Sequence, residues 1–169
     1  MKKYLIATLF GLCALSNTYA QEHDLGDPTG KIILSVSTDA TMSATDQKRI
    51  EFDKEMLMEL EQFSIKTKTP WTESADVYKG PLLRSLLEKL DIKAENITIS
   101  ALNDYKAVVP VSDAYEYDVI LATEVNGKAM SIRDKGPIFI LYPFDQNPSL
   151  KNEVIYNRSV WQANKIDVN

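Results

Sequence analysis

The stretch that decides the fold class of this sequence is GPIFILYPFD, residues 136–145. A Gly-Pro turn is followed by a run of five apolar residues, which predicts a buried strand. The run stops abruptly, so that Tyr142, a rigid turn at Pro143 and the carboxylate of Asp145 lie together at the end of this strand. Strand ends on a rigid sheet commonly receive ligands. The segment RSVW at 158–161 adds a guanidinium, a hydroxyl and an indole, a set that suits a flat, hydrogen-bonding heterocycle.

The first twenty residues have the pattern of a secretory signal peptide. Lys2 and Lys3 give a basic start, residues 4–15 form an apolar core, and Ala20 is a small residue at a suitable cleavage point. The apolar core is too short and wrongly flanked to span a membrane stably. We therefore predict export to a bacterial periplasm and removal of residues 1–20. A flexible lead-in over 21–30 and a single domain over 31–169 would remain.

Composition narrows the function classes for this domain. The chain has 24 acidic and 19 basic side chains, a formal net charge of −5, and no basic stripe. Nucleic acids and anionic membrane surfaces are therefore not expected partners, and no membrane insertion is expected after signal cleavage. The only cysteine, Cys13, belongs to the predicted signal peptide, and the only histidine, His23, lies in the lead-in. These counts argue against a Cys/His zinc site, a thiol nucleophile and a Ser-His-Asp triad, whereas a carboxylate-based calcium or magnesium site stays open.

Hydrophobic periodicity predicts a mixed α+β domain with much antiparallel sheet. An Asn-Gly hairpin is expected at 126–127, a turn at 76–81, and either irregular chain or a short helix at 154–157. Eight or so strands and two helices are expected: strands over 31–37, 63–69, 96–102, 106–111, 117–123, 129–132, 136–141 and 159–168, and helices within 44–62 and 82–91.

Several short motifs occur in a recognisable order: Thr-x-Trp at 69–71, Gly-Pro-Leu-Leu-x-x-Leu-Leu at 80–87, Asn-Asp-Tyr at 103–105, Leu-Ala-x-x-x-Asn-Gly at 121–127, Gly-Pro-Ile-Phe-Ile-Leu-Tyr-Pro at 136–143 and a closing strand with Trp161. In this joint order they resemble the molybdopterin-binding domain of the sulfite oxidase fold. The resemblance covers roughly residues 63–168 and implies the same fold for most of the predicted domain.

The resemblance also bears on the metal. Enzymes of that family hold molybdenum through a cysteine thiolate, which the resemblance places four residues before the Trp, where this chain has Thr67. A hydroxyl does not replace a soft thiolate ligand. The chain therefore looks closer to the small periplasmic pterin-binding proteins of this fold. That likeness implies a non-catalytic sensor that binds a neopterin- or monapterin-like pterin without metal and signals to the periplasmic region of a membrane-bound cyclic-di-GMP enzyme.

Nine residues are candidates for contact with such a ligand. We expect Asp145 to accept hydrogen bonds from the 2-amino group and N3–H of the pterin, and Arg158 to donate to its carbonyl or ring nitrogen. The alternatives are a turn residue for Asp145 and, for Arg158, a surface ion pair with Asp145 or Glu153. Asn103 is most simply a turn former. The other candidates supply aromatic walls or hydroxyls, with core packing or ordinary strand hydroxyls as the alternative: Trp71, Tyr105, Tyr142, Trp161, Thr67, Thr69 and Ser159.

No pair of titratable residues stands out as catalytic, because the acidic residues are scattered over turns and helix faces. Two other functions stay open. One is a molybdenum-cofactor oxidoreductase with an unusual ligand set, and the other is a purely structural or interaction domain whose pocket has decayed.

Overall fold

The computed structural model describes residues 26–38 and 49–169. The predicted signal peptide, the first half of the predicted lead-in and the start of the helix predicted within 44–62 lie outside the described residues. No helix in the described ranges is long and apolar enough to cross a membrane.

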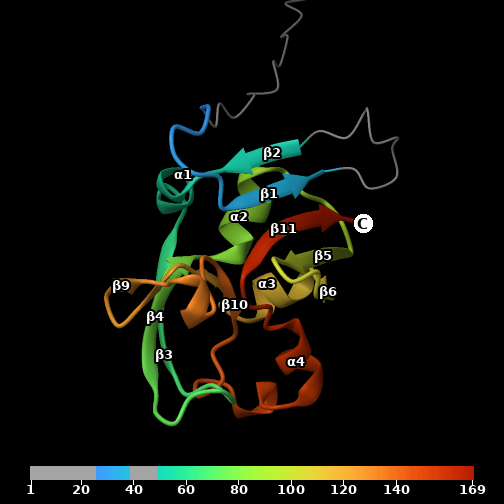
Figure 1. Ribbon diagram of the computed structural model, residues 1–169. Helices are drawn as coiled ribbons and strands as arrows, with labels where there is room; N and C mark the ends of the chain where they lie inside the picture. The colour runs from blue at the N-terminus through green and yellow to red at the C-terminus, as the bar shows by residue number, and fades with distance from the viewer. Residues whose placement is uncertain (1–25, 39–48) are drawn as a thin grey trace, which may run out of the picture.

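The largest sheet has five strands and forms the upper part of the molecule (Figure 1). Among the described strands of this sheet, the one parallel pair joins β1 and β11, with Val36 in register with Ile166, and the three other pairs are antiparallel. In spatial order the strands are β2 (Arg49–Phe52), β1 (Leu34–Ser37), β11 (Ala163–Val168), β5 (Asn96–Ala101) and β6 (Lys106–Pro110).

Two smaller sheets complete the frame. A two-stranded sheet pairs β10 (Phe139–Leu141) with β7 (Ile120–Ala122). In Figure 1, β3 and β4 run along one side of the molecule as a long hairpin below the large sheet. The third sheet has the order β3 (Gln62–Thr67), β4 (Asp76–Pro81), β8 (Glu124–Val125) and β9 (Lys128–Ala129).

The helices are short and most of them are connectors. Asp53 caps α1 by accepting a hydrogen bond from the Met56 backbone N–H, and Asn152 caps α4 in the same way through Ile155. The described residues form α1 (Lys54–Met58), α2 (Leu83–Lys89), α3 (Ser112–Glu116), α4 (Glu153–Arg158) and two 3-10 turns, η1 (Ile132–Asp134) and η2 (Pro148–Leu150).

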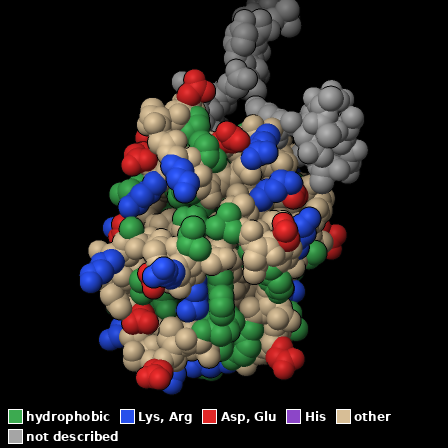
Figure 2. Space-filling view, in the orientation of Figure 1, with side chains coloured by type: hydrophobic (Ala, Val, Ile, Leu, Met, Phe, Trp, Pro, Cys, Tyr) green, Lys and Arg blue, Asp and Glu red, His purple; other side chains and the backbone are tan. Residues whose placement is uncertain are grey.

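The apolar run after the Gly-Pro turn is the centre of the core, as predicted. Residues 138–142 and Phe144 have no exposed surface. Gly80 is required where β4 passes β7, because a Cβ there would overlap the Leu121 carbonyl. The surface is mixed: in Figure 2 acidic and basic side chains are interspersed, and hydrophobic side chains gather over the lower middle of the face shown.

The α+β class with largely antiparallel sheet is confirmed, but several predicted elements differ. The prediction of a helix through 44–62 was wrong for most of its described part. Residues 49–52 form β2, because they pair with β1, and only the five residues of α1 are helical. The predicted strand at 129–132 is reduced to a short hairpin arm, with η1 beginning at Ile132.

The predicted turn at 76–81 is also wrong, since these residues form β4 in full register with β3. Gly80 and Pro81 indicated a turn, yet they lie at the end of a strand. The described part has four α-helices rather than two, with residues 154–157 in α4. The last strand begins at Ala163, so Trp161 precedes it in the loop instead of lying on it.

Candidate functional site

The two tryptophans meet at a pocket formed by three segments that are distant in sequence. Trp71 follows β3 and Trp161 precedes β11, and their indoles pack edge to face with ring centroids 4.9 Å apart. We call the hollow beside them the aromatic pocket. It has a volume of about 270 Å³ and is lined by Trp71, Asn103, Tyr105, Tyr156, Asn157, Ser159 and Trp161.

One indole is fixed in the fold and the other forms part of the rim. Trp71 packs edge to face against the fully buried Phe139 at 6.0 Å and against Tyr156 at 6.1 Å. Trp161 is 39% exposed, and the Lys135 ammonium lies 5.1 Å from the centre of its ring. A flat ligand in this pocket therefore finds a firm aromatic wall and a second indole at the solvent edge.

Tyr105 ties the two polar sides of the aromatic pocket together. Its hydroxyl donates to the Asn157 backbone carbonyl at 2.9 Å, which joins the turn after β5 to the end of α4. Its backbone N–H donates to the Asn103 Oδ1 at 3.2 Å. Ser159 contributes from the C-terminal end of α4, where its buried hydroxyl donates to the Ile155 carbonyl at 2.9 Å.

Tyr142 and Arg158 meet at the buried carboxylate of Asp113 instead of in the pocket. The Tyr142 hydroxyl donates to Asp113 Oδ2 at 2.7 Å, and the Arg158 guanidinium donates to the same oxygen at 2.9 Å. Burial, and then the hydrogen bond to Asp113, raise the pKa of Tyr142 far above its ordinary value. Arg158 is thus in an ion pair, the alternative predicted for it, although with a partner that was not expected.

Thr67 and Asp145 form a clasp between the end of β3 and the turn after β10. The Asp145 backbone N–H donates to Thr67 Oγ1 at 3.0 Å, and the Lys68 backbone N–H donates to Asp145 Oδ2 at 2.6 Å. The other carboxylate oxygen lies 2.7 Å from the Lys151 ammonium. The Lys151 ammonium and then the Lys68 N–H hold the pKa of Asp145 below its usual value. We call this arrangement the Thr67–Asp145 clasp.

Thr69 is buried between the clasp and Trp71. Its Oγ1 lies 3.2 Å from Thr72 Oγ1 and accepts from the Trp71 backbone N–H at 3.3 Å, so that it fixes the chain that carries the indole. It also lines a smaller hollow of about 200 Å³, which shares Tyr156 with the aromatic pocket.

Of the nine predicted residues, the structure brings four together in the aromatic pocket, and the other five are not among its lining residues. The four are Trp71, Tyr105, Ser159 and Trp161. Three residues that line the pocket were not among the nine candidates. Asn103 was interpreted only as a turn former, while Tyr156 and Asn157 directly precede the Arg-Ser pair that was singled out. Predicting a helix at 154–157 without the irregular alternative would have placed Tyr156 and Asn157 in the last turn of that helix, close to Ser159.

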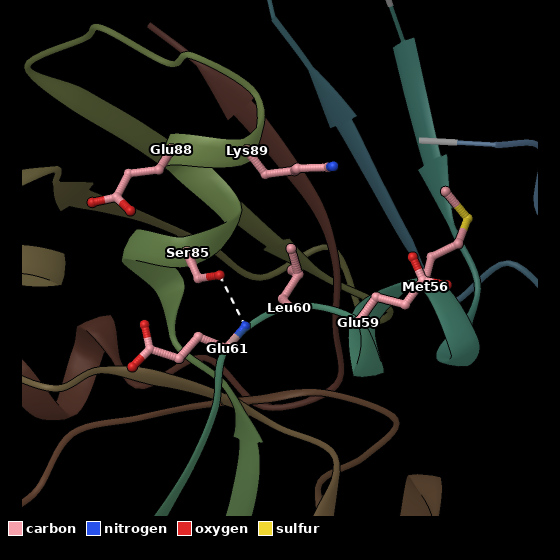
Figure 3. A pocket seen from close by; sticks show the side chains of 7 residues that line it. All are labelled: Met56, Glu59, Leu60, Glu61, Ser85, Glu88 and Lys89. Atoms are coloured by element: carbon pink, nitrogen blue, oxygen red, sulfur yellow. Dashed lines mark hydrogen bonds between the residues drawn. The ribbon is translucent and has the colours of Figure 1, made fainter. Parts of the chain in front are cut away.

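A larger hollow of about 400 Å³ lies between α1 and α2 (Figure 3). The Glu61 backbone N–H donates to Ser85 Oγ at 3.1 Å across it. Glu61 and Glu88 extend on one side of Leu60 and Glu59 extends on the other, so that their carboxylates do not converge. Within residues 26–38 and 49–169, no group of three or more metal-ligating side chains is present.

Comparison with known families identifies the family of this chain. Residues 33–144, about two thirds of the chain, match the oxidoreductase molybdopterin binding domain. The chain belongs to this family. A comparison with curated proteins gives no match. The oxidoreductase molybdopterin binding domain match includes Trp71, Asn103 and Tyr105, whereas the pocket residues of 156–161 lie beyond it.

The residues present do not fit the molybdenum centre that the oxidoreductase molybdopterin binding domain family implies. Thr67, at the position that the resemblance assigns to the metal-binding cysteine, has no exposed surface and its hydroxyl is used in the clasp. The aromatic pocket offers amide, hydroxyl and indole groups, and none of these is the soft thiolate that such a centre needs.

Proposed function

We propose that this protein is a periplasmic, non-catalytic pterin-binding protein that reports pterin occupancy to a membrane-bound cyclic-di-GMP enzyme. The observation that carries the proposal is the aromatic pocket itself, with its edge-to-face pair of Trp71 and Trp161 and its neutral polar lining. Membership of a family that binds a pterin-based cofactor supports a pterin as the ligand.

The shape and chemistry of the pocket suit a pteridine ring. Ligand sites of this kind combine apolar or aromatic walls with a few well-placed polar groups. Here two indoles and the ring of Tyr156 supply the walls, and the two asparagines supply the polar groups. A volume of about 270 Å³ is enough for a pterin with a short hydroxylated side chain and leaves its outer edge open to solvent.

The non-catalytic part of the proposal rests on chemistry, since a reaction needs groups that transfer protons, electrons or a covalent bond. In the part of the chain that the structure describes, no carboxylate, histidine or thiol lines the aromatic pocket. The nearby charged residues Asp113, Asp145 and Arg158 are held by ion pairs and hydrogen bonds within the fold. Binding and release of a small molecule need none of these groups to react.

The periplasmic location and the partner rest on sequence alone. The predicted signal peptide supports export, and the resemblance to small periplasmic pterin-binding proteins supports a membrane-bound partner. We propose that the pterin-loaded form and the empty form differ at the rim of the aromatic pocket, where Trp161 and Tyr105 are both partly exposed.

The first test is mass spectrometry of the small molecules and metals released from protein purified from the periplasm. A pterin released without molybdenum supports the proposal. If nothing is released, neopterin and monapterin are titrated by calorimetry at micromolar protein, and absence of binding up to sub-millimolar ligand contradicts it. Absence of the protein from a periplasmic extract contradicts the location.

Family membership favours a second candidate, a molybdenum-cofactor oxidoreductase with an unusual ligand set. This candidate requires stoichiometric molybdenum in the purified protein and electron transfer to an artificial acceptor. The same metal analysis therefore separates the two functions, because the pterin-binding proposal expects none.

A further inference from the structure

We propose that the carboxamides of Asn103 and Asn157 recognise the hydrogen-bonding edge of a neutral 2-amino-4-oxo pteridine in the aromatic pocket. This inference rests on the proposed function and deepens it, because it assigns the polar contacts and the chemical class of the ligand.

The first step is the charge of the lining. None of the seven residues that line the aromatic pocket carries a charge at neutral pH. The acid and base expected from the sequence are engaged elsewhere, Asp145 with Lys151 and Arg158 with Asp113. The polar edge of the ligand is therefore met by neutral groups, and a buried neutral edge needs hydrogen bonds to offset its loss of water.

The second step is the availability of donors and acceptors. The hydroxyl protons of Tyr105 and Ser159 are donated to the backbone carbonyls of Asn157 and Ile155, which leaves these two oxygens as acceptors. A carboxamide differs because it presents a donor and an acceptor side by side. Asn103 and Asn157 are both exposed residues that line the pocket, and neither side-chain amino group donates a hydrogen bond within the described residues.

The third step is position. Tyr105 binds both asparagines, through its backbone N–H to Asn103 Oδ1 and through its hydroxyl to the Asn157 backbone carbonyl. The two carboxamides therefore come from two elements that are joined across the pocket by one residue. Asn103 Oδ1 keeps a second lone pair, so its bond to Tyr105 leaves it able to accept from a ligand.

The ligand chemistry is complementary to this pair. In a pterin, N3–H lies beside the C4 carbonyl, and the C2 amino group lies beside N1, so that each side pairs a donor with an acceptor. A carboxamide matches either pair with two hydrogen bonds. A lumazine carries a C2 carbonyl in place of the amino group and a proton on N1, so the donor and the acceptor on that side are exchanged. A carboxamide that is oriented for the pterin, as Asn103 is by the Tyr105 backbone N–H at its Oδ1, opposes this exchanged pair unless it gives up that bond.

The experiment compares 6-hydroxymethylpterin with 6-hydroxymethyllumazine by calorimetry on the full-length exported protein. We expect the wild type to prefer the pterin by about tenfold, the effect of one lost or unsatisfied hydrogen bond. In Asn103→Leu or Asn157→Leu this preference should fall to about twofold or less, and pterin affinity should drop by about tenfold. Asn164→Leu, a partly exposed asparagine outside the pocket, is the matched control and should keep both values.

Thermal unfolding of each variant shows whether the fold is retained. If the wild type binds the pterin and both pocket variants keep the full preference for it, the carboxamide assignment is overturned while the pterin-binding function stands. If the wild type binds neither pteridine, the proposed function fails and this inference fails with it. Loss of the preference in at least one pocket variant, with the control unchanged, supports the assignment.

Discussion

Trp71 and Trp161 pack edge to face with ring centroids 4.9 Å apart, although one follows the third strand and the other precedes the last. Trp71 lies inside the segment that matches the family, and Trp161 lies beyond it. The aromatic pocket thus combines a wall from the shared domain with a wall from the C-terminal part of this chain.

Trp161→Ala should weaken pterin binding by about tenfold or more with little loss of stability. The indole is 39% exposed, so its removal takes a stacking surface from the ligand and little from the core. Loss of one aromatic stacking partner costs roughly 1–3 kcal/mol in comparable sites. Calorimetry with neopterin measures the effect, Trp161→Phe should retain part of the affinity, and Val108→Ala, an exposed apolar residue on β6, is the control. If Trp161→Ala binds neopterin with wild-type affinity, this indole is not part of the binding site.

Asp113→Ala should lower the free energy of unfolding by about 2–3 kcal/mol, somewhat below the usual value for a fully buried pair because Arg158 is partly exposed. The change leaves the Tyr142 hydroxyl and the Arg158 guanidinium without their shared acceptor. Tyr142→Phe should cost less, since it leaves the ion pair in place. Urea unfolding of the single variants and of Asp113→Ala/Arg158→Ala gives the coupling energy, and strict additivity would show that the ion pair does not stabilise the fold.

Thr67→Val should cost about 1–2 kcal/mol of stability, because the Asp145 backbone N–H loses its acceptor while the side-chain volume is kept. Urea unfolding measures the change. Ser64→Val is the matched control, since it alters an exposed hydroxyl on the same strand. Equal stability of Thr67→Val and wild type would mean that the clasp is held by the Asp145 carboxylate alone.

The Thr67–Asp145 clasp should make stability sensitive to acid. The Lys151 ammonium and the Lys68 N–H lower the pKa of Asp145 in the folded protein. A carboxyl with a lowered folded pKa adds stability above its unfolded pKa, about 4, and loses this contribution as pH falls through the folded value. As the pH falls below 5, the free energy of unfolding of Asp145→Asn should therefore decrease less than that of the wild type. Urea unfolding at each pH measures both values. If the free energies of unfolding of the wild type and Asp145→Asn fall in parallel with pH, the Asp145 carboxylate does not cause the acid sensitivity.

Much of the secondary structure could be predicted, because it follows from residue patterns that are local in the sequence. The buried run after Gly136, the apolar face of α2 and the Asn126-Gly127 hairpin follow from periodicity and turn chemistry, and both hairpin residues have the expected positive φ. β4 could not be predicted in this way, since its Gly-Pro end indicated a turn and its strand conformation depends on pairing with β3.

The candidate site shows the same division. Aromatic residues at the ends of predicted strands could be singled out from sequence, and Trp71, Tyr105 and Trp161 do line one pocket. The partners of the charged residues could not be predicted from sequence. Arg158 meets Asp113 and Asp145 meets Lys151 only through tertiary packing. Asn103 and Asn157 carry no sequence pattern that separates a ligand contact from a turn residue.

The placement of β11 at the middle of the large sheet has a consequence for how the chain acquires its structure. Within the described sheet, β1 pairs with β2 and β11. The β1–β2 hairpin can therefore join the other strands only after β11 is available, when Val36 comes into register with Ile166. Contacts between residues so far apart in sequence carry a high entropic cost of loop closure, and domains rich in them fold in milliseconds to seconds. The five-stranded sheet should therefore stay incomplete until β11 has been synthesised, and such a delay in folding would suit the export that we propose for this protein.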